Sequence, residues 1–214
     1  MQKNTLLWIF MCLMAPMGFA QDSGKILDEL SAKAKNFDSI YAEYSSRLLD
    51  EQNGIDLKQE GSIRVKGKLY NLELGDYILI TDGETHWTYE KGTNDCYVDY
   101  LEDVEGDSFS PSEMFTLWEN DFKHEYKGSE TINGKSAHWI NLYPNQPADK
   151  TFHTIQLYID KSKMEVVRIV VKGREGSDVI YNVKSFTPNA EIPANKFKFN
   201  ANDFPGVNII DNRI

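Results

Sequence analysis

The sequence predicts a mainly β protein, with helical spacing in only two segments. The clearest evidence is Ile78–Tyr89, where two runs of β-forming residues flank the pair Asp82-Gly83. Such a pair between alternating segments is a strong hairpin signal. Asn53-Gly54 and Asn133-Gly134 separate further alternating runs in the same way. With eleven Tyr, eleven Phe and four Trp, the chain also has ample apolar material to line a sheet. We therefore expect an antiparallel meander that carries a large apolar surface.

Residues 1–20 have the features of a signal peptide and are set apart from the fold. Lys3 supplies the positive start, and the apolar run Leu6–Met14 is too short to span a bilayer. Small residues around Ala20 favour cleavage after that position. Cys12 lies inside the apolar run between bulky neighbours, which disfavours a lipid-attachment site. We expect a soluble mature chain.

The charge and cysteine content restrict the possible partners and the compartment. The chain has 33 acidic and 23 basic residues and a formal charge of −10. This balance disfavours nucleic acid and anionic membrane surfaces as partners, because both are polyanions. Beyond residue 20 the only cysteine is Cys96, so an exported chain is expected to hold its fold without an internal disulfide. The length of residues 21–214 favours a single domain.

The first half of the chain reads as one helix followed by a meander. Ile26, Leu30 and Ala34 form an apolar stripe in a predicted helix over Ser23–Asn36, which Asp22 or Ser23 is placed to cap. Alternation then predicts a strand over Ile40–Leu48. The strands expected next are Leu57–Val65, Lys68–Leu74, the two arms of the Asp82-Gly83 hairpin, and Cys96–Tyr100.

The second half starts with a solvated acidic loop, Glu102–Asp107, and a second helix. Ser110-Pro111-Ser112-Glu113 is a capping box with proline at the first helical position, which predicts a helix over Ser110–Asp121. Strands are then expected at Lys123–Ile132, Ala137–Tyr143, Thr154–Asp160, Val166–Lys172 and Val179–Phe186, before a tail over Ile192–Ile210.

No catalytic, metal or cofactor site is predicted. The histidines His86, His124, His138 and His153 fall in separate strands without metal-ligand spacing. The sequence contains no nucleophile elbow, phosphate loop or metalloprotease motif. We expect a protein that is not an enzyme and that binds an apolar ligand on its sheet.

Five short segments, in order and at similar spacing, resemble the outer-membrane lipoprotein carrier proteins of the LolA family. They are Ile40-x-Ala42-x-Tyr44, Glu60–Lys66, Leu69–Leu72, Ile80–Tyr89, and Phe197-Lys198-Phe199 with Pro205–Ile209. The resemblance implies a half-open antiparallel β-barrel with a helical lid. It also implies a periplasmic carrier in a Gram-negative bacterium, monomeric in solution, that shields the acyl chains of lipoproteins. Such a carrier takes lipoproteins from an inner-membrane releasing complex and passes them to an outer-membrane receptor.

A secreted binder of free lipid or of another apolar ligand is the alternative, because the same fold can serve either function. The side chains expected to bind lipid are Ile40, Tyr44, Tyr70, Leu72, Trp87, Tyr89, Met114, Phe115 and Trp118. The family often carries a lid-holding arginine after Val-Lys, where this chain reads Val65–Lys68. The side chains considered for lid control are therefore Arg47, Arg64, Lys66 and Lys68, although a lysine cannot copy the arginine fork.

Overall fold

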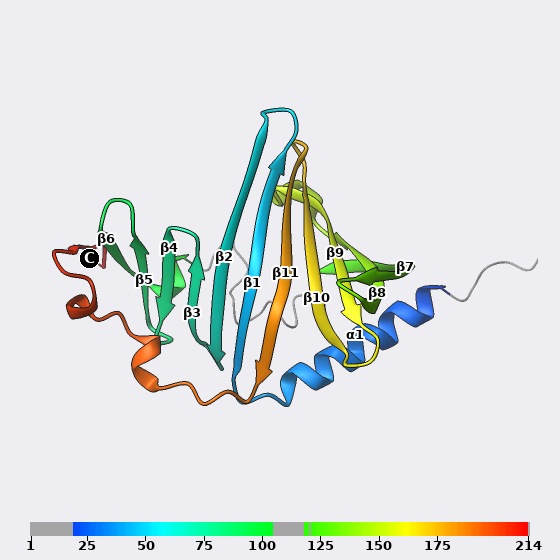
Figure 1. The fold of residues 1–214 in the computed structure, drawn as a ribbon, viewed down its shortest axis with the longest axis horizontal. Helices are drawn as coiled ribbons and strands as arrows, with labels where there is room; N and C mark the ends of the chain where they lie inside the picture. Colours follow the sequence, from blue (N-terminus) through cyan, green and yellow to red (C-terminus); the bar gives the residue numbers. More distant parts are fainter. Residues whose placement is uncertain (1–18, 105–117, 120, 214) are drawn as a thin grey trace, which may run out of the picture.

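The computed structural model of the chain describes residues 19–104, 118, 119 and 121–213. It is a mostly β structure built on one open twelve-stranded sheet that curves into a half-barrel (Figure 1). The sheet order is β12-β6-β5-β4-β3-β2-β1-β11-β10-β9-β8-β7. The predicted fold class, a half-open barrel of mainly antiparallel strands, is confirmed.

Two meanders, β2–β6 and β7–β11, extend to either side of the central strand β1. Among the described strands, every pairing is antiparallel except that of β12 with β6. The strands are β1 Ile40–Asp50, β2 Ile55–Lys66, β3 Leu69–Leu74, β4 Tyr77–Thr81, β5 Thr85–Glu90, β6 Asp95–Tyr100, β7 Phe122–Ile132, β8 Lys135–Pro144, β9 Phe152–Asp160, β10 Glu165–Gly173, β11 Ser177–Pro188 and β12 Asn208–Asp211. The helices are α1 Phe19–Lys35 and α2 Leu101–Val104, with short 3-10 turns η1 Pro147–Asp149, η2 Ala194–Phe197 and η3 Ala201–Asp203.

Alternating burial along β1 sets the two faces of the sheet. Ile40, Ala42 and Tyr44 are buried, whereas Glu43 between them is exposed. Successive side chains of a strand point to opposite faces, and directly paired residues of neighbouring strands point to the same face. The register of the strand pairings therefore assigns each residue to the concave face, which contains Ala42 and Tyr44, or to the outer face.

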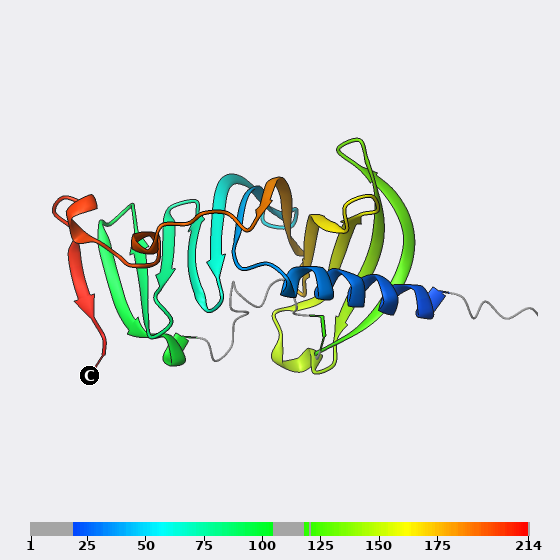
Figure 2. The ribbon, with the colours of Figure 1, turned by 90° about the horizontal axis from the view of Figure 1, so that it is seen from below.

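Helix α1 covers the concave face of the β7–β10 part of the sheet (Figures 1 and 2). Its buried residues Leu27 and Leu30 belong to a cluster with Ile140 of β8 and Leu157 of β9. The predicted helix is confirmed, but it begins at Phe19, before the predicted start. Because Ser23 lies inside the helix, neither it nor Asp22 is the cap. The Oγ of Ser23 instead hydrogen-bonds to Nδ1 of His124 on β7, over 2.9 Å.

The connection between the two meanders differs from its prediction where it is described. The acidic segment predicted as a loop begins with the short helix α2, whose Leu101 is buried. Most of the predicted helix Ser110–Asp121 lies outside the described residues. At its end, Trp118 and Glu119 form a turn.

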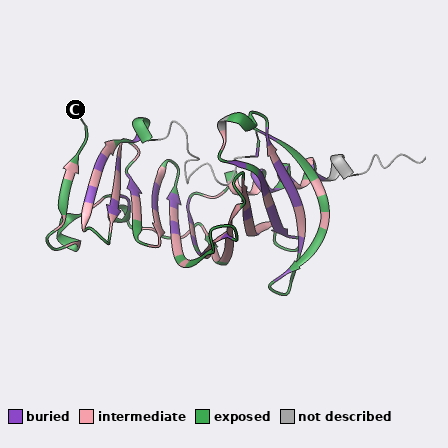
Figure 3. Cartoon of the chain, turned by 90° about the horizontal axis from the view of Figure 1, so that it is seen from above, coloured by how far each residue is buried: buried purple, intermediate pink, exposed green. Residues whose placement is uncertain are grey.

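The segment after β11 covers the opposite face at the other end of the molecule. It runs past β3 and β4 and ends in β12 (Figure 2). Phe197 is buried, and Phe199, Phe204 and Val207 pack on a cluster formed by Tyr89, Cys96 and Val98. Besides the residues under α1 and under this C-terminal segment, buried residues cluster around Tyr44 and Tyr70 and around Tyr158 and Val170, so buried stretches occur along much of the sheet (Figure 3).

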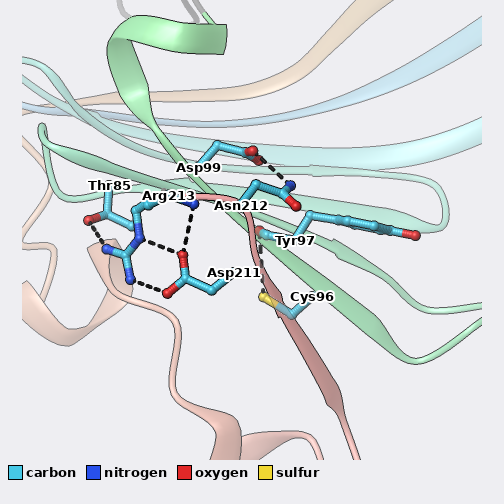
Figure 4. A network of polar contacts seen from close by, with 7 residues as sticks. All are labelled: Thr85, Cys96, Tyr97, Asp99, Asp211, Asn212 and Arg213. Carbon is cyan, nitrogen blue, oxygen red and sulfur yellow. Dashed lines mark hydrogen bonds and ion pairs between the residues drawn. The ribbon is translucent and has the colours of Figure 1, made fainter.

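Polar contacts fasten β12 along the edge of β6 (Figure 4). Asn212 donates to the carboxylate of Asp99 over 2.9 Å. Arg213 binds both carboxylate oxygens of Asp211, and it also donates to the hydroxyl of Thr85 over 3.1 Å. Hydrogen bonds from Arg213 lower the pKa of Asp211 to about 2.

Candidate functional site

An apolar cavity of about 140 Å³ lies between α1 and the concave face of the central strands. Its lining comes from α1 and the residues after it, β1–β3, Trp118, and the β10–β11 side of the sheet. The lining residues are Leu30, Lys33, Ala34, Phe37, Ala42, Tyr44, Ile63, Leu72, Leu74, Trp118, Met164, Glu165, Val166, Ile169, Tyr181, Val183 and Phe186. Only Lys33 and Glu165 among these carry a charge, so the cavity suits a ligand with an apolar body.

Tyr44 reaches across the sheet because β2 has a glycine beside it. A Cβ built at Gly61 would overlap the Tyr44 ring and the backbone oxygen of Glu73. Without that Cβ, the ring crosses β2, and the Tyr44 hydroxyl donates to the Glu73 carbonyl of β3 over 2.9 Å. Gly61 and Tyr44 thus build one part of the cavity wall together.

A second tyrosine, Tyr181 of β11, meets Tyr44 edge-on, with the ring centroids 5.9 Å apart. Burial raises the pKa of the Tyr44 hydroxyl above its ordinary value, and the neighbouring Tyr181 raises it further. Burial also raises the pKa of Tyr181. Both hydroxyls therefore stay protonated at neutral pH, and the wall they form is uncharged.

Polar contacts hold α1 over the cavity through the 118–119 turn. The indole Nε1 of Trp118 donates to Oγ of Ser31 over 2.7 Å, and both side chains are buried. Lys35 pairs with Glu119 over 2.6 Å. The hydrogen bond from Lys35, and a weaker one from Ser31, lower the pKa of Glu119.

A second set of contacts ties α1 to the turn between β9 and β10. Nζ of Lys33 lies 3.1 Å from Oε1 of Glu165, and it also donates to the carbonyl of Lys163. The turn itself is fixed by Asp160, which accepts hydrogen bonds from Ser162 and from the backbone of Lys163. The cavity is therefore bordered at this side by an ion pair.

Three of the predicted lipid-binding residues line the cavity: Tyr44, Leu72 and Trp118. Tyr70 is on the same face, in the core cluster next to the cavity that also contains Tyr44 and Ala42. Ile40 is buried on β1, two positions before Ala42. The other two residues predicted in the lid, Met114 and Phe115, lie outside the described residues.

Trp87 and Tyr89 are on the outer face, which corrects the expectation that they share a face with Tyr44. Leu72 of the cavity pairs with Leu79, and Leu79 pairs with Thr88. Thr88 therefore faces the concave side, and its neighbours Trp87 and Tyr89 point away from it. The hairpin was predicted correctly, and Trp87 and Tyr89 do share a face. Which face points toward the cavity could not be predicted, because it depends on the register of three earlier strand pairings.

On the outer face these two aromatic residues pack beneath the C-terminal segment. The ring of Tyr89 lies 4.3 Å from that of Phe204, centroid to centroid, and its hydroxyl donates to Asn94 over 2.9 Å. Trp87 packs against the same cluster. They contribute to the core of this part of the sheet and not to the cavity.

The arginines considered for lid control are also on the outer face. Arg47 pairs with Asp56 over 2.7 Å, and Arg64 pairs with Glu73 over 3.1 Å and lies over the ring of Tyr41. Lys66 and Lys68 are exposed at the β2–β3 turn. Arg47 and Arg64 therefore point away from the cavity and from α1. The lysine that lies at the cavity is Lys33 of α1, which pairs with Glu165.

Sequence reasoning missed the β10–β11 side of the cavity. Val183 and Phe186 of β11 line it because this strand pairs with β1, which is far away in sequence. Alternation in Tyr181-Asn182-Val183 indicated a strand with one apolar face, but its neighbour in the sheet could not be read from the pattern. The sequence pattern also could not show that Lys33 of α1 lies beside Glu165 of β10, because the two residues are far apart in sequence.

Other chemistry is sparse in the part of the chain that the structure describes. No three His, Cys, Asp or Glu side chains gather there as a metal site would require. Cys96 is a free, buried thiol, and burial raises its pKa to about 11. In the same described ranges, every helix is too short or too polar to cross a membrane.

The fold and the cavity define a class: an open half-barrel with an apolar cavity beneath a helix. The family model described as outer membrane lipoprotein carrier protein LolA matches residues 39–200. The chain belongs to this family.

Comparisons with individual proteins show the extent of the likeness. A solved structure of an uncharacterized conserved protein from Thermus thermophilus is 12% identical, with a TM-score of 0.58 over 89% of this chain and 99% of its own. LprF from Mycobacterium bovis is 12% identical, with a TM-score of 0.50 over 82% of this chain and 97% of its own. At this identity the likenesses show the fold.

An uncharacterized protein of Methanocaldococcus jannaschii is 22% identical over 137 residues, which is 63% of this chain. The match spans 38% of the length of that relative.

Proposed function

We propose that this protein is a periplasmic carrier that shields the acyl chains of lipoproteins and moves them from the inner to the outer membrane. Its partners would be an inner-membrane releasing complex and an outer-membrane receptor. It would act as a monomer, without cofactor and without enzymatic activity. The observation that carries the proposal is the apolar cavity between α1 and the central strands, and membership of the LolA family supports it.

The thermodynamic need for such a cavity is clear. Each CH₂ of an acyl chain left in water costs about 0.8 kcal/mol, so a lipoprotein needs an apolar enclosure during transfer. Sheet, helix and Trp118 supply one without a charged residue other than Lys33 and Glu165.

The cavity must enlarge to accept an acyl chain. An engineered protein cavity of about 150 Å³ holds a benzene molecule. The cavity here is about 140 Å³, and an acyl chain is much larger than benzene. We propose that loading widens the cavity by moving α1 away from the central strands, which would break the Lys33–Glu165 contact and strain or break the Trp118–Ser31 contact.

A binder of free lipid is the second candidate, and the small size of the closed cavity favours it, because one free acyl chain needs less opening than a multiply acylated lipoprotein. Depleting the protein and fractionating the membranes separates the two functions. Lipoproteins stranded in the inner membrane would support the carrier, whereas unchanged sorting would support the binder of free lipid.

Two leucines of β3 provide a matched test of the cavity itself. Leu72 lines the cavity, and Leu69 points to the outer face of the same strand; both are half-buried. We expect Leu72→Glu to abolish binding of a fluorescent fatty acid, because a carboxylate among acyl chains loses hydration or must take up a proton. Leu69→Glu should keep the parental affinity.

Circular dichroism and the urea midpoint establish that both variants are folded before titration. Equal binding by the two folded variants would show that the ligand is not held on the concave face.

A further inference from the structure

The wall of the cavity contains one hydroxyl group that is not used in the fold. Tyr181 lines the cavity from β11, where it pairs with Ile169 of β10 and Ser46 of β1. Among the residues that the structure describes, its hydroxyl has no hydrogen-bond partner. The other polar groups of the wall are engaged: Tyr44 donates to a backbone carbonyl, and Lys33 pairs with Glu165.

Tyr181 is only partly buried. An apolar ligand that covers its hydroxyl would remove the hydrogen bonds of that group to water, which is costly unless the ligand supplies an acceptor. A water molecule inside a cavity needs two to four polar partners, and this wall is almost entirely apolar. The group that suits the site is an acceptor attached to a hydrocarbon chain.

We propose that the Tyr181 hydroxyl binds the carbonyl oxygen of an acyl ligand, such as an ester, an amide or a carboxylic acid. This inference rests on the proposed function, because it places an acyl chain in the cavity. It adds that the Tyr181 hydroxyl favours a carbonyl-bearing chain over a plain hydrocarbon of the same length.

The surrounding residues fix the direction in which the chain would lie. Ile169, opposite Tyr181, is four positions after Glu165 on β10, which is roughly 13 Å along a strand. The Tyr181 hydroxyl and the Lys33–Glu165 pair are therefore separate polar points. From Tyr181, apolar wall continues along β11 to Phe186, whose ring lies 5.9 Å from that of Phe37 after α1. A chain held by its carbonyl at Tyr181 would lay its tail along this wall.

The test compares methyl dodecanoate with tetradecane, which has the same chain length and no acceptor, as competitors of a fluorescent naphthylamine bound to the full-length mature protein. The preference for the ester is the ratio of the ester's affinity to that of the alkane. Tyr181→Phe keeps the ring and removes only the hydroxyl. It should lower this preference by about three- to tenfold, which corresponds to one hydrogen bond, and leave the affinity for the alkane unchanged.

Tyr41→Phe is the control, because it makes the same change on the outer face of β1, where the hydroxyl donates to Glu43. It should retain the preference for the ester, provided that its near-UV spectrum shows a folded protein. A preference that Tyr181→Phe does not lower, or equal weakening of both competitors, would overturn the role of Tyr181 while leaving the cavity intact. Failure of the parent to bind the naphthylamine or either competitor would overturn the proposed function, and the role of Tyr181 with it.

Discussion

At the scale of single residues, Gly61 is a position that leaves no room for a side chain. Gly61→Ala would place a methyl group against the Tyr44 ring and the Glu73 carbonyl. Because overpacking forces side chains and backbone to shift, we expect a loss of about 1–3 kcal/mol in the free energy of unfolding. Urea denaturation measures it.

Gly92→Ala is the matched control, since a Cβ there meets no atom within 4 Å. Its unfolding free energy should stay within about 0.5 kcal/mol of the parent. A similar stability for both variants would mean that Tyr44 does not depend on the missing Cβ.

The residues of the site could be predicted only where the local pattern carries the information. Alternation along β1 placed Tyr44 on the buried face from sequence alone, and the structure agrees. The face of Trp87 could not be found in this way. It depends on the sum of all the registers between β1 and β5, and a shift by one residue in any of them exchanges the two faces.

At the scale of the elements, the attachment of α1 should control how fast a ligand enters. Ser31→Ala removes the acceptor of the Trp118 indole, so the closed state loses a buried hydrogen bond. Such a loss is worth about 1 kcal/mol, which predicts about a fivefold faster uptake of an apolar fluorescent probe. Stopped-flow fluorescence measures the rate.

Glu29→Ala, on the exposed side of the same helix, controls for changes in helix propensity. Its uptake rate should equal that of the parent. If Ser31→Ala also leaves the rate unchanged, movement of α1 is not the step that limits uptake.

Individual elements were the part of the fold most accessible from sequence. Turn pairs such as Asn133-Gly134 and regular alternation marked nearly every strand to within a few residues. The parallel pairing of β12 with β6 had no such signal, because it is made by Asn208–Asp211 after a long irregular segment. The position of α1 over β7–β10 could not be predicted either, because an apolar stripe shows which side of a helix is buried but not which strands it packs against.

At the scale of the whole molecule, stability should fall on acidification. Hydrogen bonds lower the folded-state pKa of several carboxylates, among them Asp160 and Glu119. These groups stabilise the fold at pH values above their ordinary pKa of about 4, and the contribution is lost as pH falls toward the lowered values. The urea midpoint should therefore be stable near neutral pH and decline below about pH 4.

Asp160→Asn tests this assignment at one position. Asp160 is buried, and its ionised carboxylate accepts hydrogen bonds from Ser162 and from the Lys163 backbone. An amide in its place cannot titrate, so the variant should be less stable at neutral pH and decline less steeply in acid. A decline as steep as that of the parent would remove Asp160 from the acid-sensitive groups.

The seam between β1 and β11 has a consequence for how the chain acquires its fold. Ile40 pairs with Pro188 and Asp50 with Ser177, so the centre of the sheet joins segments that lie far apart in sequence. Each meander on its own consists of neighbours connected by short turns, which form quickly. The seam instead needs closure of a very long loop, whose entropic cost must be met before the pairing is gained. The two halves are thus expected to organise early and to join late, and the cavity, whose walls come from both halves, exists only once they have joined.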